Sequence, residues 1–387
     1  MHIIIYLFPA LVNYILGGTF FISAYELSVA GHGGFVVTCV VAAWALIYSL
    51  VSAIMGKITT VENSARLIVL AALGISASSL IFIFPGIAWQ FIGIAAIGVT
   101  SAVYCAPFQV FMKDLEPDQD SGVVRPTALY TASWSIGMAT GPFIFGMLDR
   151  NTGFIINALM GIVMAGSIWL IAKKYQGKRS LRVSRAPGSK TPEEADYSRM
   201  PDYAWVGWLV AGVGTIAVSL VRTLIPYRAN LLSIGKEEAG MILAVVSYAQ
   251  AAMAFLLLRS RYWMYKPKPA LLIGLSGALA LMLFGFGSTA SAFFIGALLY
   301  GLYSGCIYFY LVFHSLAHPS KSAHYVAVNE MVVGIASVAG ALAGGTITQI
   351  FNADTSFVLC GIVIVAVTCL QWRIFSLIKS VKHEGIK

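Results

Sequence analysis

Hydrophobic stretches long enough to cross a membrane recur along the whole chain, separated by short polar loops. A transmembrane helix needs about 20 mostly apolar residues to span ~30 Å of hydrocarbon. The pattern predicts twelve such helices, at residues 3–25, 34–56, 67–84, 88–112, 126–148, 153–172, 203–226, 238–258, 269–287, 291–313, 324–350 and 355–378. We therefore expect an all-α polytopic membrane protein.

One long polar segment, residues 173–202, interrupts this pattern. It carries eight basic residues, has three prolines and shows no apolar periodicity, as a cytoplasmic linker would. It divides the chain into an N-terminal six-helix bundle (1–172) and a C-terminal six-helix bundle (203–387). A binding role for the basic run stays open beside that of a solvated linker facing the lipid surface.

The distribution of charge predicts the orientation. All but five of the 25 Lys and Arg residues fall in regions that are cytoplasmic if the N-terminus is cytoplasmic; the exceptions are Arg150, Arg222, Arg228, Lys236 and Arg373, the last near the end of the twelfth predicted helix. Positive charge gathers on the cytoplasmic side of membrane proteins. Both termini are therefore expected in the cytoplasm. The net charge of +9 then indicates contact with anionic membrane lipids and not with nucleic acid.

The two halves of the chain resemble each other weakly. "FMKDLEPDQDSG" leads into a fifth helix carrying "GMATGPFIFG", and "FHSLAHPSKSA" leads into an eleventh carrying "ASVAGALAGG". Pro117 then corresponds to Pro319, Gly141 to Gly340 and Gly146 to Gly345, roughly 200 residues apart. Such a duplication predicts pseudo-two-fold symmetry, with a cavity between two bundles that rock about it.

These features resemble the major facilitator superfamily (MFS) over the whole chain. "GKITTVENSAR", from Gly56 to Arg66, is similar to that family's loop signature, although Thr60 stands where the family has Asp. Gly137-x3-Gly141-Pro142-x3-Gly146 looks like the fifth-helix motif of its proton-coupled exporters, which also occurs in other members. The resemblance implies the MFS fold, transport by alternating access and a gating role for Gly56 and Arg66.

The fifth-helix motif also has a physical interpretation. Helices in lipid associate through close backbone approach, which small residues allow. Pro142 lacks an N–H, so the carbonyl of Met138 loses its helical partner and the helix can bend. We expect Gly137, Gly141 and Pro142 to form a gating surface between the bundles. Tight packing in a static bundle is the alternative.

Motifs for catalysis are missing from the sequence. It contains no HExxH, GxSxG or Walker-type GxxxxGK[ST] pattern, and its five cysteines have no metal-binding spacing. We therefore predict neither an enzyme nor a metal or cofactor. Energy for transport would then come from an ion gradient or from the gradient of the solute.

Ionisable residues within predicted helices are costly in a membrane and are typical of solute sites and proton relays. Arg222 is a candidate solute ligand, with snorkelling towards the headgroups as its alternative. Glu330 is a candidate proton-coupling residue, with a structural hydrogen bond as its alternative. Glu26, at the outer end of the first predicted helix, is a second proton-coupling candidate.

Polar and aromatic residues at mid-depth complete the predicted solute site. They can supply hydrogen bonds and ring stacking, although any single one can equally be core filler. The candidates are Asn13, Gln109, Tyr130, Trp134, Gln250, Tyr303 and Asn329.

The sequence as a whole predicts a secondary transporter for a small organic solute in a bacterial cytoplasmic membrane. Arg222 favours an anionic or zwitterionic solute, and the fifth-helix motif favours proton coupling. We expect a monomer, since two bundles enclose a pathway by themselves. An importer or facilitator without proton coupling stays open, as does a polytopic membrane enzyme or a sensor that transports nothing.

Overall fold

Twelve long helices make up the part of the chain that the structure describes. The computed structural model covers residues 5–115, 124–179, 202–260, 262–263, 266–316 and 322–377, and no strand occurs among them. The helices are α2 (Leu7–Val29), α3 (Gly34–Ile58), α4 (Ser64–Ile81), α5 (Ile87–Leu115), α6 (Val124–Met147), α7 (Arg150–Arg179), α9 (Ala204–Leu231), α10 (Lys236–Arg259), α11 (Pro267–Phe286), α12 (Ala290–Leu316), α13 (Ser322–Ile350) and α14 (Ala353–Leu377).

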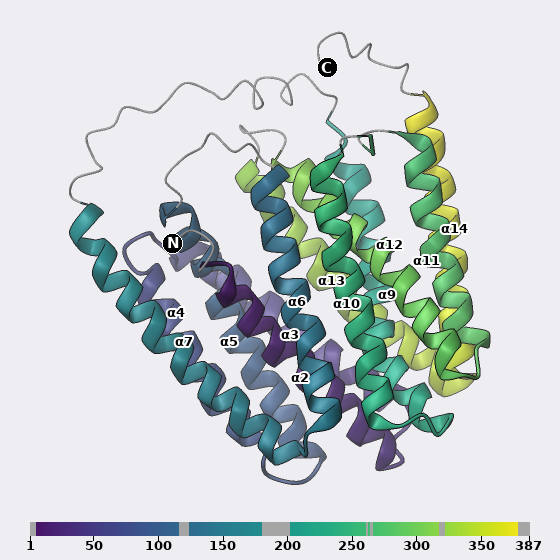
Figure 1. The fold of residues 1–387 in the computed structure, drawn as a ribbon, viewed down its shortest axis with the longest axis horizontal. Coiled ribbons are helices and arrows are strands. Elements are labelled where there is room, and N and C mark those ends of the chain that lie inside the picture. The colour runs from purple at the N-terminus through teal and green to yellow at the C-terminus, as the bar shows by residue number, and fades with distance from the viewer. Residues whose placement is uncertain are drawn as a thin grey trace.

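Eleven of these helices are long and apolar enough to cross a membrane. The exception among the described residues is α6, which holds the predicted fifth span and runs beside the others (Figure 1). Its sequence, VRPTALYTASWSIGMATGPFIFGM, is rich in Gly, Ser and Thr, which lowers its hydropathy. Those small and polar residues are explained by its packing, because α6 is covered by protein on two sides.

The helices form two bundles, α2–α7 and α9–α14, which stand side by side (Figure 1). Within the first bundle α2 packs on α6, α3 on α5 and α4 on α7; within the second, α9 packs on α13, α10 on α12 and α11 on α14. Each pair has its counterpart six helices later. Between the bundles the main contacts are α6 with α10 and α3 with α13, which are again equivalent. The predicted two-bundle fold with pseudo-two-fold symmetry is confirmed.

Several helices extend beyond the predicted spans. α2 runs to Val29 instead of residue 25, and α9 runs to Leu231 instead of residue 226. The sequence patterns end early because charged residues occur there, Glu26 in α2 and Arg228 in α9. In the structure both charges have partners inside the protein, so the helices continue past them.

An ion pair joins three helices at the end of the first bundle where α2 ends and α7 begins. Arg150, the first residue of α7, lies 3.2 Å from the Glu26 carboxylate on α2. The same guanidinium donates hydrogen bonds of 2.8 and 3.0 Å to the carbonyls of Phe82 and Phe84, at the end of α4. Gln90 donates to Glu26 at 3.2 Å. Arg150 therefore satisfies carbonyls that the end of a helix leaves without intrahelical partners.

The second bundle repeats this arrangement with the charges exchanged. Arg228 on α9 occupies the place of Glu26 on α2, three residues before the helix ends. It pairs with Asp354 in the first turn of α14 and donates a 3.0 Å hydrogen bond to the carbonyl of Gly287, just after α11. Each bundle thus has one arginine that joins its first, third and sixth helices. The arginine belongs to the sixth helix in the first bundle and to the first helix in the second bundle.

The predicted glycine correspondence also holds in space. Side chains added at Gly141 and Gly340 would meet the first helix of their own bundle, at Tyr14 and Ile216 respectively. Side chains added at Gly146 and Gly345 would meet the other bundle, at Glu237 and Thr38. Equivalent glycines therefore make equivalent contacts. Pro117 and Pro319, the third predicted pair, lie outside the described residues.

The exchanged ion pairs lead to a prediction about stability. Arg150→Ala should lower the free energy of unfolding by about 1–3 kcal/mol, because a partly buried carboxylate and two carbonyls lose their partner. The double variant Glu26→Arg/Arg150→Glu should recover much of this loss, since the second bundle tolerates the reversed order. Thermal unfolding of the purified protein in detergent measures both effects. A double variant that is less stable than both Glu26→Arg and Arg150→Glu would contradict the equivalence of the two ion pairs.

Candidate functional site

A small cavity lies between the two bundles. It is lined by residues of α2 and α6 from the first bundle and of α9, α10 and α12 from the second. Its volume, measured as the space open to the centre of a water molecule, is about 20 Å³, room for roughly one water. Any larger solute can occupy this site only if the surrounding helices move apart.

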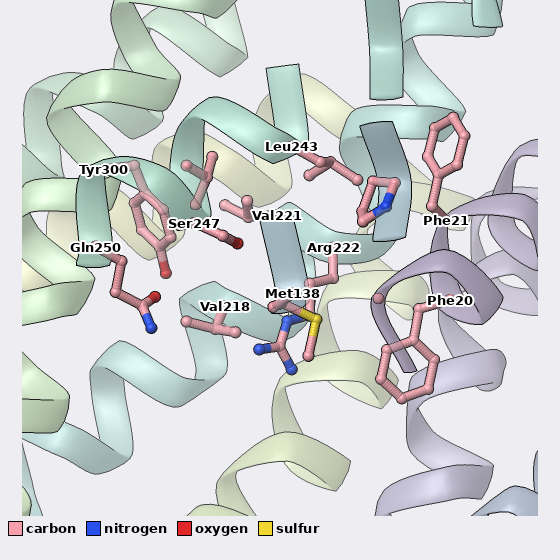
Figure 2. Close-up of a pocket in the computed structure, with 13 residues that line it drawn as sticks. Phe20, Phe21, Met138, Val218, Val221, Arg222, Leu243, Ser247, Gln250 and Tyr300 are labelled. Carbon is pink, nitrogen blue, oxygen red and sulfur yellow. The ribbon is translucent and has the colours of Figure 1, made fainter. Parts of the chain in front are cut away.

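Arg222 is the charged residue in the described wall of this cavity (Figure 2). It lies nine residues before the end of α9, or about 13 Å along the helix axis, which is deeper than the predicted span implied. Tyr300 and Tyr308 are near its guanidinium. It makes no ion pair with any residue that the structure describes. This depth and the cavity wall around it argue against snorkelling.

The rest of the wall is mostly apolar. It includes Phe20 and Phe21 of α2, Val218 and Val221 of α9 and Leu243 of α10 (Figure 2). Both phenylalanines are buried. A guanidinium among such side chains has lost much of its hydration, which is costly unless a partner of opposite charge replaces it.

Gln250, a predicted solute ligand, lines the same cavity and links the two bundles. Its amide donates a 2.8 Å hydrogen bond to Ser135 of α6, and its carbonyl accepts one of 3.0 Å from Ser304 of α12. A second link joins the hydroxyls of Thr140 and Tyr248 at 3.2 Å. The α6–α10 contact therefore contains polar groups that can exchange partners when the bundles move.

Glu330 lies in a separate cluster, away from the cavity. Its carboxylate accepts a 3.3 Å hydrogen bond from Tyr48 of α3, so it spans the second contact between the bundles. The amide of Gln109 faces both Glu330 and Tyr130, and Cys105 lies beside Tyr48. Of the predicted residues, Glu330, Gln109 and Tyr130 thus come together away from the cavity.

Four predicted solute ligands have other surroundings. Asn329 bonds to Trp208 at 2.7 Å and to the Leu311 carbonyl at 3.4 Å, and Asn13 bonds to the Pro9 carbonyl of its own helix. Tyr303 lines a second cavity, inside the C-terminal bundle. Trp134 stacks edge-on against Tyr308 across the bundle contact, with ring centroids 5.2 Å apart. Of these four, Trp134 is the one that contacts a neighbour of Arg222, because Tyr308 lies near that guanidinium.

The expected gating residues divide between two surfaces. Gly137 and Gly141 face Ala10 and Tyr14 of α2, within their own bundle, which differs from the predicted position between the bundles. Pro142 does lie at the bundle contact: its carbonyl is 2.5 Å from where a side chain on Gly240 of α10 would begin. The glycine strip is thus fixed against α2, while the following turn meets the other bundle.

The remaining predicted residues lie near helix ends. Gly56, near the end of α3, and Arg66, near the start of α4, are exposed, and no residue packs where a side chain on Gly56 would be. Glu26, near the end of α2, is held in the ion pair with Arg150.

Several residues of the site were not predicted. Ser135, Ser247 and Ser304 are short polar residues within helices, a pattern common enough in membrane proteins to carry no signal. Phe20 and Phe21 are indistinguishable in sequence from phenylalanines that face lipid. Tyr48 gave a weak signal only, as a tyrosine in the middle of an otherwise apolar helix.

Comparisons with known proteins agree with this architecture. The family model described as Major Facilitator Superfamily matches residues 3–318, while no curated protein matches the sequence. The human organic anion transporter MFSD10 (TETRAN) has a similar structure, with a TM-score of 0.62 at 12% identity over 97% of this chain and 99% of that one.

Two further solved structures are similar. A POT family transporter in complex with a thioalcohol-conjugated peptide has a TM-score of 0.67 at 14% identity, over 96% of this chain and 95% of that one. A bacterial homologue of the human lysosomal transporter Spinster, inward-facing and occupied, has a TM-score of 0.66 at 13% identity, over 97% and 96%. At these identities the likeness shows the fold alone.

The position of Gly141 gives a prediction. Gly141→Ala should destabilise the protein by about 1–3 kcal/mol, because the added methyl group overlaps the Tyr14 carbonyl, which belongs to a helix backbone and cannot turn away. Gly166→Ala is the matched control, since that helical glycine has open space around it. Thermal unfolding and yield of folded protein measure the difference. Equal stability of the two variants would refute the close contact.

Proposed function

The chain belongs to the major facilitator superfamily, whose members are membrane transporters and not enzymes, and from this premise we propose that it is a secondary transporter for a small organic solute. The solute binds between the bundles at Arg222 and Gln250 and crosses by alternating access. Protons supply the driving force through Glu330. In this proposal the protein works as a monomer in a bacterial cytoplasmic membrane, with both termini in the cytoplasm.

The observation that carries the proposal is Arg222. The other basic residues of the outer half have partners within the protein. Arg150 and Arg228 pair with carboxylates, and Lys236 donates a 2.6 Å hydrogen bond to the Leu148 carbonyl. Arg222 lies between the bundles without such a partner. An anionic or zwitterionic solute would supply the missing negative charge, and the energy of that contact would favour binding there.

The contacts between the bundles support alternating access. At the outer face Asn230 donates to Ser28 at 3.0 Å, and Lys236 reaches Leu148 across the same boundary. In the cytoplasmic half Tyr48 bonds to Glu330. A net hydrogen bond contributes about 1 kcal/mol, and one to a charged group contributes about 1.5–3 kcal/mol. Opening one side therefore costs a few kcal/mol in these contacts, and the helices that enclose the 20 Å³ cavity can part to admit a solute.

The proposed moving parts are the two bundles, residues 1–172 and 203–387, connected by the linker at 173–202. Pro142 would form the surface on which the bundles move, together with Gly146 of α6 and Gly345 of α13, which face the opposite bundle. Gly56 and Arg66 would act at the cytoplasmic ends of α3 and α4. Glu26 is the weaker candidate for proton coupling, because Arg150 and Gln90 already engage its carboxylate.

A first test concerns Arg222. A screen of small organic solutes by thermal shift identifies a ligand, since binding to the folded state raises the unfolding temperature. Arg222→Gln should weaken binding of an anionic ligand by at least 2 kcal/mol, about the contribution of a charge-assisted contact in a desolvated site. Arg259→Gln, at the exposed cytoplasmic end of α10, is the control. Unchanged affinity in Arg222→Gln would refute the assignment.

A second test concerns Glu330. Gln mimics the protonated carboxyl and keeps its shape, so Glu330→Gln should abolish accumulation driven by a pH gradient while it preserves exchange of labelled solute across the vesicle membrane. A purely structural Glu330 would instead make both fluxes fall together. Side-by-side measurement in proteoliposomes decides between these results. Intact pH-driven accumulation would exclude Glu330 as the coupling residue and make Glu26 the next candidate.

A further inference from the structure

The charge inventory of the cavity limits what the solute can be. Arg222 is the one charged side chain in the described wall, and no described carboxylate lines the cavity. The polar neighbours Ser247, Gln250 and Tyr300 are neutral. A bound anion therefore meets a single positive charge, and a second negative charge on the same solute would be buried without compensation, which is costly in a low-dielectric site.

Glu330 is too far away to serve the same small solute as Arg222. Its neighbour Asn329 bonds to Trp208 of α9, which lies fourteen residues before Arg222 on that helix. Fourteen residues of α-helix extend about 21 Å. The other carboxylates that pack near α9 and α2, Asp354 and Glu26, are already held by arginines at the outer face.

The hydrogen-bonding capacity of the wall is equally one-sided. A guanidinium offers five N–H donors and no acceptor. The Gln250 carbonyl already accepts from Ser304, its amide donates to Ser135, and the Tyr300 hydroxyl donates to the Gly214 carbonyl at 3.3 Å. The uncommitted groups are mainly donors. A solute that brings an ammonium group would meet a like charge and no carboxylate.

The remainder of the wall favours an apolar body. Phe20, Phe21, Val218, Val221 and Leu243 provide aromatic and branched aliphatic surface, and Met138 adds a flexible side chain that adapts to irregular shapes. A sugar-like solute would leave hydroxyls unsatisfied against these groups. A ring or alkyl chain would gain contact with them, and aromatic rings pair well with Phe edges and faces.

We propose that this site selects a monovalent organic anion, a single carboxylate or equivalent group on an apolar ring or chain, with no ammonium group. The carboxylate lies on Arg222, and the apolar body contacts the two phenylalanines and the aliphatic residues of α9 and α10. This inference rests on the proposed solute site at Arg222 and narrows its substrate class. It excludes amino acids, dicarboxylates and sugars as good ligands.

Four related probes test the selectivity on the purified protein in detergent: benzoate, phenylalanine, phthalate and benzamide. All four contain one benzene ring. Benzoate carries one negative charge, phenylalanine adds an ammonium group, phthalate has a second carboxylate and benzamide has no charge. Binding is measured by calorimetry and thermal shift. Benzoate should bind at least tenfold more tightly than each of the other three. Equal or tighter binding of any of them, or no binding of benzoate, would overturn the inference.

Two variants connect the selectivity to the residue. Arg222→Gln should weaken benzoate binding at least tenfold and remove its advantage over benzamide, while Arg259→Gln should change neither. Arg222→Lys retains the charge and should keep the preference for benzoate over benzamide. This Lys variant serves as the test if the Gln variant does not fold. Loss of the preference in a folded Lys variant, or its persistence in a folded Gln variant, would contradict the role of the charge.

The result is separable from the proposed transport function. Arg222-dependent binding of phenylalanine in place of benzoate would overturn the inference on solute class and leave a transporter for zwitterions. Arg222-dependent binding of benzoate, with no saturable flux of an impermeant analogue such as 4-toluenesulfonate into proteoliposomes, would support the inference and refute transport of this class.

Discussion

Close contact between helix backbones is the constraint on which this structure depends. Lipid supplies no hydrophobic force that drives apolar helices together, so they associate where side chains are small enough for backbones to meet. Helix α6 does this on two sides. Gly141 faces the backbone of α2 at Tyr14, and the Pro142 carbonyl faces Gly240 of α10. One contact lies inside a bundle and the other lies between bundles.

The two kinds of contact have different mechanical consequences. The α2–α6 contact within the bundle is supported by an ion pair between α2 and α7 and by the carbonyls at the end of α4. The α6–α10 contact between bundles has glycine, a proline carbonyl and neutral hydrogen bonds through Gln250 and Tyr248. No described ion pair crosses between the bundles. Among the described residues, ion pairs thus occur within each bundle, while glycine contacts and single hydrogen bonds join the two.

Much of this fold is predictable from the sequence because the membrane imposes strict rules. Twelve apolar stretches, one basic linker and the Gly141/Gly340 and Gly146/Gly345 correspondence were enough for the two-bundle fold with its internal symmetry. Helix ends were harder to predict, because the charged residues Glu26 and Arg228 resemble helix boundaries until their partners Arg150 and Asp354 are known. Those partners lie more than a hundred residues away in the chain, beyond the reach of any local pattern.

The candidate site was predicted only in part, for a similar reason. Arg222 and Glu330 could be selected as candidates because an ionisable residue in a membrane helix is costly wherever it points. Asn329 and Tyr303 have the same residue types as real ligands, yet the rotation of their helices turns them towards Trp208 and into the C-terminal bundle. Sequence periodicity does not show which face of a buried helix meets a cavity, since all its faces are apolar.

The separation of the two ionisable groups has a consequence for the proposed mechanism. With about 21 Å of helix between the levels of Asn329 and Arg222, a proton on Glu330 cannot act on the solute directly. Glu330 bonds instead to Tyr48 of the other bundle, so its charge acts on the contact between the bundles. Proton and solute would then be coupled through the equilibrium between bundle arrangements, and each must shift the binding of the other by the same factor.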